Sequence, residues 1–205
     1  MTVTNSSKAI GTTVDGGTLD LYDDAVAQDS TVKNGVMTVT NSAKAIRTRV
    51  NDGGVIVLGN GVEAIDTTIH QGGELNLRGN AALSGNNQLD GVVRFARVVD
   101  SFHTLTIDDP LSGNGHFVMN TDLASRQGDS LKLHGAVSGN HTLVVADSGA
   151  DPVGAAQSLM LVDGNGGDGN FNLFGNTVDA GAYRFQLQQE GNDWYLASRG
   201  CTEFC

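Results

Sequence analysis

The chain has 205 residues, of which 39% are hydrophobic and 17% charged, with 28 glycines and only 2 prolines. This composition is too apolar for a disordered chain, and it lacks the proline content and Gly-X-Y order of collagen. The net charge of −11 has the wrong sign for binding nucleic acids or anionic membranes, so we expect neither partner.

Internal repetition dominates the first half of the chain. Residues 1–10 return as residues 37–46 with nine of ten positions identical, and a degenerate copy between them sets the period at eighteen to nineteen positions. Four hydrophobic columns follow this period: Met1, Leu19, Met37, Ile56 and Leu75; Val3, Leu21, Val39, Leu58 and Leu77; Ala9, Ala27, Ala45 and Ala64; and Val14, Val32, Val50 and Ile69.

The spacing inside each unit indicates β-strands. Hydrophobic residues two apart, such as Met1 and Val3, place their side chains on one face of a strand. We expect two short strands per unit, joined by corners in which glycine and asparagine supply positive φ angles. A unit this small cannot bury its own apolar face, whereas stacked copies can. The pattern therefore predicts an all-β chain, a right-handed parallel β-helix of right-angled or triangular section.

Two polar columns and one polar face share this period. We expect a corner ladder, in which side chains hydrogen-bond the backbone or each other, at Asn5, Asp23, Asn41 and Asn60. We expect an inward ladder of hydrogen-bonded hydroxyls at Thr12, Ser30, Thr48 and Thr67. An outward polar face includes Thr2, Thr38 and Thr40.

The repetition fades after about residue 83, and residues 84–102 are expected to form a last irregular rung. Alternating apolar and polar residues then predict strands at 103–107, 116–119, 130–134, 142–146, 158–162, 171–174, 182–189 and 193–197. The last two flank Gly191 and predict a β-hairpin. We expect β-helix rungs over 1–102 and, over 103–197, a cap that protects the edge of the last rung.

Residues 198–205 are predicted to be a tail that need not belong to the natural protein. Its two cysteines, Cys201 and Cys205, allow either a disulfide or a two-thiol metal site, and the sequence does not choose between them.

Catalytic patterns are weak throughout the sequence. Asp23 and Asp24 fit a solvated corner better than a general acid–base pair, and the five histidines are scattered without zinc-ligand spacing. No nucleophile elbow occurs. The glycine-rich segment 164–171 faintly matches a calcium-binding nonapeptide but occurs once. We therefore expect no enzyme, no cofactor and no metal.

The second half of the sequence resembles a known family. Its segments occur in a specific order: GNGHFVMN at 113–120, GDSLKL at 128–133, SGNHTLVVADSGADP at 138–152, SLMLVD at 158–163 and VDAGAYRFQL at 178–187. Over about residues 112–197 this order resembles the pertactin-like C-terminal end of autotransporter passenger domains. The first half is similar, more loosely, to the rungs of self-associating and diffuse-adherence autotransporter adhesins.

The resemblance implies type V secretion to the cell surface, across the outer membrane of a Gram-negative bacterium, through the passenger's own C-terminal β-barrel. The C-terminal end would emerge and fold first and then template the other rungs, as an autochaperone. The expected folding nucleus is the aromatic hairpin core, Tyr183, Phe185, Leu187, Trp194 and Leu196. We expect the chain to be a passenger fragment, with the signal peptide, most rungs and the barrel outside it.

The function expected from this resemblance is adhesion, autoaggregation or biofilm formation, in which a host-cell receptor or neighbouring bacterial passengers would be the partners and virulence the outcome. A heptosyltransferase is a further expected partner, because relatives of the diffuse-adherence group carry heptose on Ser or Thr. The candidate acceptors in reachable corners are Ser6, Ser7 and Ser42. Two alternatives stay open: a folding and spacing scaffold whose activity lies elsewhere in the passenger, and a polysaccharide-active β-helix enzyme.

Overall fold

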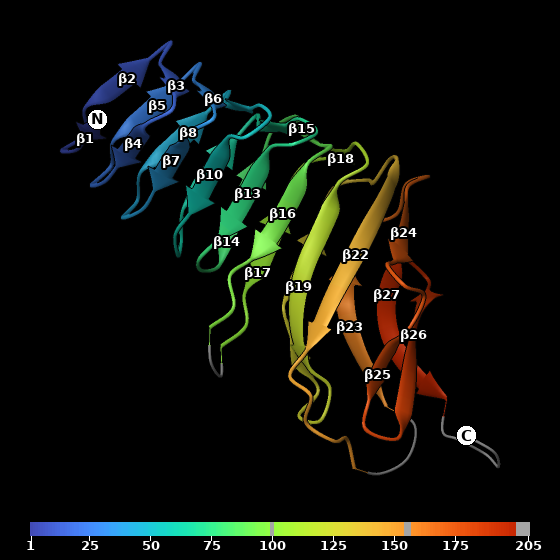
Figure 1. The fold of residues 1–205 in the computed structure, drawn as a ribbon. Helices are drawn as coiled ribbons and strands as arrows, with labels where there is room; N and C mark the ends of the chain where they lie inside the picture. Colours follow the sequence, from blue (N-terminus) through green and yellow to red (C-terminus); the bar gives the residue numbers. More distant parts are fainter. Residues whose placement is uncertain (99–100, 154–156, 200–205) are drawn as a thin grey trace.

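The computed structural model describes residues 1–98, 101–153 and 157–199, which form 27 β-strands and no helix. None of these described residues belongs to a helix that could span a membrane. The strands wind into an elongated coil with the N-terminus at its narrow end (Figure 1). The predicted tail beyond residue 199, with Cys201 and Cys205, lies outside the described residues.

Sheet A, the first of three sheets, has ten strands and runs the length of the coil. In spatial order its strands are β1 (Thr2–Val3), β4 (Thr18–Leu21), β7 (Val36–Val39), β10 (Val55–Leu58), β13 (Glu74–Leu77), β16 (Val92–Phe95), β19 (His116–Asp122), β22 (Asn140–Asp147) and β24 (Asn170–Leu173). A short tenth strand, β20 (Gln127–Gly128), pairs with β19 in the antiparallel sense.

Sheet B has eleven strands and sheet C has six. Sheet B comprises β2 (Lys8–Ile10), β5 (Val26–Gln28), β8 (Lys44–Ile46), β11 (Glu63–Ile65), β14 (Ala81–Ser84), β17 (Thr104–Ile107), β21 (Ser130–Leu133), β23 (Ser158–Asp163), β27 (Asp193–Arg199), β26 (Tyr183–Glu190) and β25 (Val178–Ala180). Sheet C comprises β3 (Thr13–Asp15), β6 (Thr31–Lys33), β9 (Arg49–Val50), β12 (Thr68–Ile69), β15 (Asn87–Leu89) and β18 (Leu111–Ser112).

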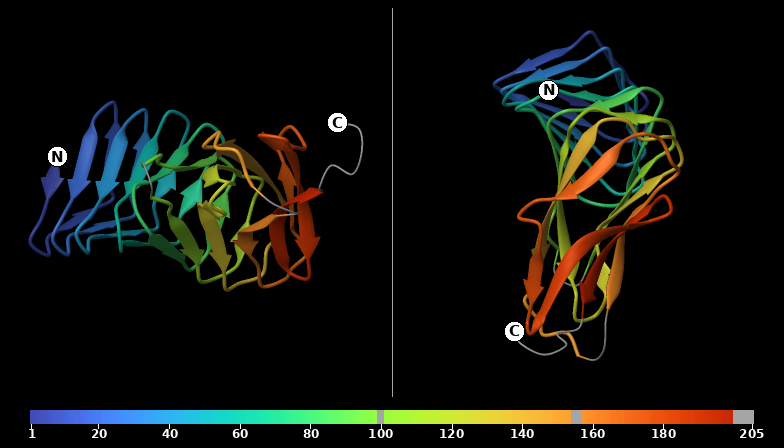
Figure 2. Two further views of the ribbon diagram at one scale, coloured as in Figure 1. Left: turned by 90° about the horizontal axis from the view of Figure 1, so that it is seen from below. Right: turned by 90° about the vertical axis from the view of Figure 1, so that its right-hand side faces the viewer.

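The predicted parallel β-helix is confirmed, but the expectation of two strands per unit is wrong. Each regular rung contributes one strand to each of the three sheets, so the coil has the triangular section that the sequence left open (Figure 2). The sequence pattern does not predict the third strand because this strand is very short, with only two residues in β9 and in β12. So short a stretch shows a single buried side chain and no alternation.

Rungs lengthen along the chain. Thr2 pairs with Asp20, eighteen positions further on. The step grows to twenty-six positions where His116 pairs with Thr142, and to thirty where Asn140 pairs with Asn170. The extra residues enter the connections between the strands and the strands themselves, so the coil is wider near its C-terminal end (Figure 1).

The four predicted hydrophobic columns face the interior. Leu19, Met37, Ile56 and Leu75 have no exposed surface, and Ala27 pairs with Ala45 and Ala45 with Ala64 in register. Met1 is the exception, since 67% of its surface is exposed in the outermost rung. Stacking each rung on the next therefore buries one continuous core, as the repeat pattern predicts.

The corner ladder is confirmed for Asn60, whose side-chain oxygen accepts the backbone N–H of Asn80 at 3.1 Å. Asp23 accepts a bond from the Thr4 hydroxyl instead. Among the described residues Asn5 and Asn41 make no side-chain hydrogen bond, and they supply backbone φ angles of 56° and 50° to the turns. Asparagine is common in such corners because it tolerates this left-handed conformation.

The hydroxyl column points inward as expected, but its hydrogen bonds are not made. Ser30, Thr48 and Thr67 have no exposed surface, and their hydroxyls have no partner among the described residues. Neighbouring rungs lie about 4.8 Å apart, whereas hydroxyls bond over about 2.8 Å. Their own carbonyls are already engaged, since the Thr48 and Thr67 oxygens each accept a backbone N–H of the next rung. The distance between rungs, rather than the polarity of the side chains, therefore leaves these hydroxyls without hydrogen bonds.

A buried carboxylate organises the first long rung. Asp129 is 1% exposed, and its oxygens accept the backbone N–H groups of His103 and Asn120, both at 2.7 Å. The Asn120 carboxamide also donates to Asp129 and to the carbonyl of Phe95. These bonds tie sheet A to sheet B where regular repetition ends.

The buried hydroxyls generate the first prediction. Thr48→Val replaces an unpaired buried hydroxyl with a methyl group of similar size, so the free energy of unfolding should rise by about 1 kcal/mol. Urea unfolding measures this change. Thr31→Val, in the neighbouring outward column, is the matched control and should change stability little; a loss of stability in Thr48→Val would contradict the assignment.

Candidate functional site

The C-terminal cap forms on the edge of sheet B. β27 pairs antiparallel with β23, β26 pairs with β27, and β25 pairs with β26. The predicted hairpin is confirmed: Glu190 pairs with Asp193 across a turn in which Gly191 has a φ of 63°. The eight strands predicted beyond residue 103 are all present, with ends shifted by a few positions.

Aromatic rings fill the wide end of the coil. The centroids of Phe117 and His141 lie 5.7 Å apart, those of His141 and Phe171 5.3 Å, and those of Phe171 and Trp194 4.9 Å. The last pair is edge-to-face, an arrangement that adds about 0.5–1.5 kcal/mol to the effect of burial. This chain of rings joins sheet A to the hairpin of sheet B.

The predicted nucleus residues lie in this cap, and the hairpin brings them together. Phe185, Trp194 and Leu196 are buried, whereas Tyr183 and Leu187 are partly buried against the same core. Leu187 pairs directly with Leu196. Whether they nucleate folding is a question of kinetics, so that part stays a prediction.

His141 is the residue of this cluster that the sequence did not reveal. It has no exposed surface, and its Nδ1 accepts the backbone N–H of Gly115 while its Nε2 donates to the carbonyl of Ser138. Burial lowers the pKa of the imidazole below its usual value. The only sequence signal was a histidine in an inward position of an alternating strand, between Asn140 and Thr142.

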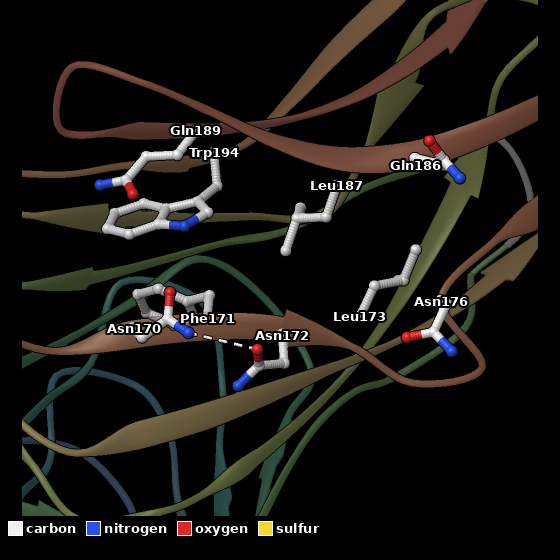
Figure 3. A pocket seen from close by; sticks show the side chains of 9 residues that line it. All are labelled: Asn170, Phe171, Asn172, Leu173, Asn176, Gln186, Leu187, Gln189 and Trp194. Atoms are coloured by element: carbon white, nitrogen blue, oxygen red, sulfur yellow. Dashed lines mark hydrogen bonds between the residues drawn. The ribbon is translucent and has the colours of Figure 1, made fainter.

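A cleft opens between the last strand of sheet A and the hairpin of sheet B (Figure 3). Its volume is about 350 Å³. β24 and the turn after it form one wall, and β26 with the start of β27 forms the other (Figure 3). The lining side chains are Asn170, Phe171, Asn172, Leu173, Asn176, Gln186, Leu187, Gln189 and Trp194.

The outer face of sheet A is the second candidate surface. Thr2 pairs with Asp20 and Asp20 with Thr38, so these two predicted threonines share one outward column. Thr40, the third, lies just past the end of β7, where its hydroxyl donates to the carbonyl of Leu21. Val57 continues the register but is only 5% exposed, and the partly exposed Asn76 follows it. Beside it Val36 pairs with Val55, and both valines are partly exposed. This face thus carries hydroxyl, amide and apolar groups on a flat, regular lattice.

Charges on the outside of the coil pair between rungs. Arg47 donates to Asp29 at 2.6 Å, and this bond lowers the pKa of the Asp29 carboxyl. Lys44 donates to Glu63 in the same way on sheet B. Exposed pairs of this kind are screened by water and contribute little stability.

The remaining predicted residues lie in exposed corners. Ser6, Ser7 and Ser42 are exposed, and Ser6 and Ser42 have φ angles of 60° and 63°. Asp23 and Asp24 occupy the same kind of turn. Within the described part of the chain no three acidic, histidine or cysteine side chains gather as metal ligands, and this part includes the glycine-rich segment 164–171.

The Pertactin family model matches residues 87–198, more than half of the chain. The chain belongs to the pertactin family. The matched segment begins in the last regular rungs and runs to the end of the hairpin, so it contains the aromatic cluster, the cleft and the cap.

Sequence relatives agree with this assignment. The chain is 36% identical over 146 residues to Autotransporter CRAC of Citrobacter rodentium and 35% identical over 155 residues to the autotransporter adhesin/invasin TibA of Escherichia coli. These alignments cover 68% and 71% of this chain. An immunoglobulin A1 protease autotransporter of Haemophilus influenzae is 36% identical over 60% of the chain. The chain spans only 9%, 16% and 7% of these three relatives.

A solved structure supports the fold alone. The Haemophilus influenzae Hap adhesin superposes on 96% of this chain with a TM-score of 0.56 and 20% sequence identity, and the match covers 24% of the Hap chain. The chain is thus a segment of an autotransporter passenger domain, a class of protein carried to the surface of Gram-negative bacteria.

The environment of His141 predicts a pH dependence. Its pKa is lowered in the folded state, so below about 6.5, the ordinary histidine value, the unfolded chain binds a proton that the folded chain excludes. Stability should therefore fall as the pH drops below about 6.5, and the loss should level off near the folded pKa. Urea midpoints between pH 8 and pH 5 measure this trend.

His141→Gln removes the titrating group and should flatten this part of the profile. His116→Gln is the matched control, because His116 is exposed and its loss should leave the slope unchanged. Equal slopes in the native chain and in His141→Gln would contradict the assigned role of the buried imidazole.

Proposed function

We propose that this chain is an adhesive and self-associating segment of its passenger, and that the outer face of sheet A is the contact surface. The observation that carries the proposal is the stacking of Thr2, Asp20 and Thr38 in one outward column, beside the partly exposed Val36 and Val55. Its partner would be a host-cell receptor or a neighbouring passenger. The similarity to TibA, which is named an autotransporter adhesin/invasin, supports this proposal.

The physical basis of such binding is repetition. One rung offers a few threonine, asparagine and valine side chains, which make weak contacts on their own. A rigid coil presents the same pattern at a fixed spacing, so contacts made together gain strength through effective concentration. Binding through sheet A should therefore strengthen with the number of rungs.

Charge inserted in sheet A tests this proposal. In Thr38→Glu/Val55→Glu two carboxylates enter the proposed contact face, where like charges meet across a self-associating pair at a cost of several kcal/mol. We expect clumping and cell adhesion to fall about tenfold or more when the parent passenger is displayed on bacteria. Sedimentation and bound-cell counts at matched surface levels measure both.

Thr31→Glu/Thr68→Glu is the matched control, because it adds the same charge to partly exposed positions of sheet C. It should leave clumping and adhesion near the native level. If both double variants behave alike, sheet A is not the contact face. If neither changes binding, the segment is a folding and spacing scaffold.

We further propose that the chain is organised as rungs over 1–102 and an autochaperone cap over 103–197, with Tyr183, Phe185, Leu187, Trp194 and Leu196 as the folding nucleus. The support is that the hairpin contacts are local in sequence, whereas each rung must find a neighbour at least one full repeat away. Local contacts close with the smallest loss of chain entropy. The hairpin then offers a formed edge to β23.

Substitutions of two buried leucines distinguish a folding nucleus from ordinary core packing. Leu196→Ala in the cap and Leu58→Ala in an early rung both remove a fully buried side chain, and each should cost about 2–5 kcal/mol. If the cap nucleates folding, Leu196→Ala slows refolding roughly tenfold or more, whereas Leu58→Ala mainly speeds unfolding. Stopped-flow folding and unfolding rates measure both. If Leu196→Ala instead mainly speeds unfolding and Leu58→Ala slows refolding, the cap does not act as an autochaperone.

We propose no catalytic role for this segment. The protease named among the relatives is a far longer protein, of which the matched part is 7%. A polysaccharide-active enzyme would require glycan turnover that is lost when one acidic residue is changed. Heptose transfer to Ser6, Ser7 or Ser42 stays a proposal supported by the exposure of these corners, and the intact mass of native material tests it.

A further inference from the structure

The cap extends sheet B by three antiparallel strands and adds none to sheet A. β24 is the last strand of sheet A, and no described strand pairs with its outer side. Asn170 donates its backbone N–H to Gly139, and Phe174 donates to Leu143, both toward β22. Backbone groups alternate along a strand, so those of Phe171 and Leu173 point away from β22. These groups border the cleft between β24 and the hairpin.

The lining of this cleft is polar but uncharged. Five of its nine side chains are carboxamides, namely Asn170, Asn172, Asn176, Gln186 and Gln189. None of the nine carries a charge, although the chain has 23 acidic residues and 12 Lys and Arg residues. Each carboxamide both donates and accepts hydrogen bonds. Two are held in place, since Asn170 donates to Asn172 and Gln189 donates to the carbonyl of Gly191.

Trp194 adds a donor that the protein itself does not use. The residue is only 4% exposed, and its indole N–H makes no hydrogen bond to any described residue. Figure 3 shows the indole nitrogen on the side of the ring that faces β24. The nitrogen is not among the enclosed polar atoms that lack a partner, so it is open to the cleft and can donate to a ligand there.

We propose that this cleft is a binding site for the end of a neutral oligosaccharide. Sugar hydroxyls donate and accept, which matches the carboxamides, the indole N–H and the free backbone groups of β24. The apolar sides of Leu173 and Leu187 suit the C–H face of a sugar ring. Acidic sugars are disfavoured, because the lining offers no cation and the chain carries a net charge of −11. The volume of about 350 Å³ lies within the roughly 300–1,000 Å³ of small-molecule sites.

An extended peptide is the competing occupant of a free strand edge. The edge here is short: β24 has four residues, and only Phe171 and Leu173 turn their backbone groups toward the cleft. A peptide added here could therefore form backbone hydrogen bonds with only these two residues of β24. An added peptide strand bonds mainly through its backbone. The carboxamides on both walls therefore offer more side-chain hydrogen bonds than such a peptide would use. The observations therefore favour the sugar.

The single tryptophan of the chain makes the test direct. Its indole N–H gives one resonance in a ¹H–¹⁵N correlation spectrum, and that resonance reports from inside the cleft. The probes are maltotriose and N,N′,N″-triacetylchitotriose as neutral trisaccharides, a sialylated trisaccharide, and the capped peptide Thr-Val-Thr-Val. We expect saturable shifts of the Trp194 resonance with a neutral trisaccharide and none with the sialylated probe or the peptide.

Paired variants locate the effect. Asn172→Ala/Gln189→Ala removes a carboxamide from each wall and should weaken binding about tenfold, the effect expected from two lost hydrogen bonds. Gln188→Ala is the matched control, because Gln188 lies beside Gln189 in β26 but is not among the residues that line the cleft. Its affinity should stay native.

Three results would overturn the proposal: no shift with either neutral sugar at tens of millimolar, shifts that survive Asn172→Ala/Gln189→Ala, or shifts produced by the peptide alone. The last result would identify β24 as a peptide-binding edge. The site is independent of the contact face proposed on sheet A. The cleft variants should leave clumping unchanged, and Thr38→Glu/Val55→Glu should leave sugar binding unchanged.

Discussion

The constraint on which this structure depends is that no rung can stand alone. A short rung has two inward side chains in its sheet A strand and one in each of the other two, and its backbone groups are satisfied only by the rungs on either side. Stacking resolves both problems in one step, because the register that forms the backbone bonds also aligns Leu19 with Met37 and Ala27 with Ala45. Core and backbone are therefore specified together.

This coupling explains the contrast between the two sides of the coil. Inside, an added polar atom is costly, and the hydroxyls of Ser30, Thr48 and Thr67 are tolerated only because they are small. Outside, the same register places charged groups such as Asp29 and Arg47 within bonding distance. The outer faces can therefore vary in chemistry while the core keeps the register, which suits a surface protein that needs a constant scaffold and changeable contacts.

The parts of the fold that could be predicted are those that follow from periodicity. The inward columns, the parallel coil and the C-terminal hairpin all leave a repeating or alternating pattern in the sequence. The third strand of each rung left only one inward column, Val14, Val32, Val50 and Ile69, because a stretch with one buried side chain does not alternate and so is not recognised as a strand. The burial of His141 and the absence of hydrogen bonds in the hydroxyl column could not be predicted for another reason. The surroundings of a histidine or threonine side chain are set only when the rungs stack.

The candidate site was partly visible in the same way. The sequence located the aromatic hairpin, with Phe185, Trp194 and Leu196, because its strands are adjacent in the chain. It could not show that β24 ends sheet A beside that hairpin, since the two walls of the cleft are joined only through tertiary packing. Local patterns therefore predicted the elements of the site but not the gap between them.

The lengthening of the rungs toward the C-terminal end has a mechanical consequence. Alanine fills much of the narrow end, whereas Phe117, Phe171 and Trp194 fill the wide one. A load applied along the axis meets the fewest contacts at the thinnest rungs, so the coil should peel apart there while its base stays intact. The taper therefore places the mechanically weakest rungs of this segment at its N-terminal end and the strongest at its C-terminal base.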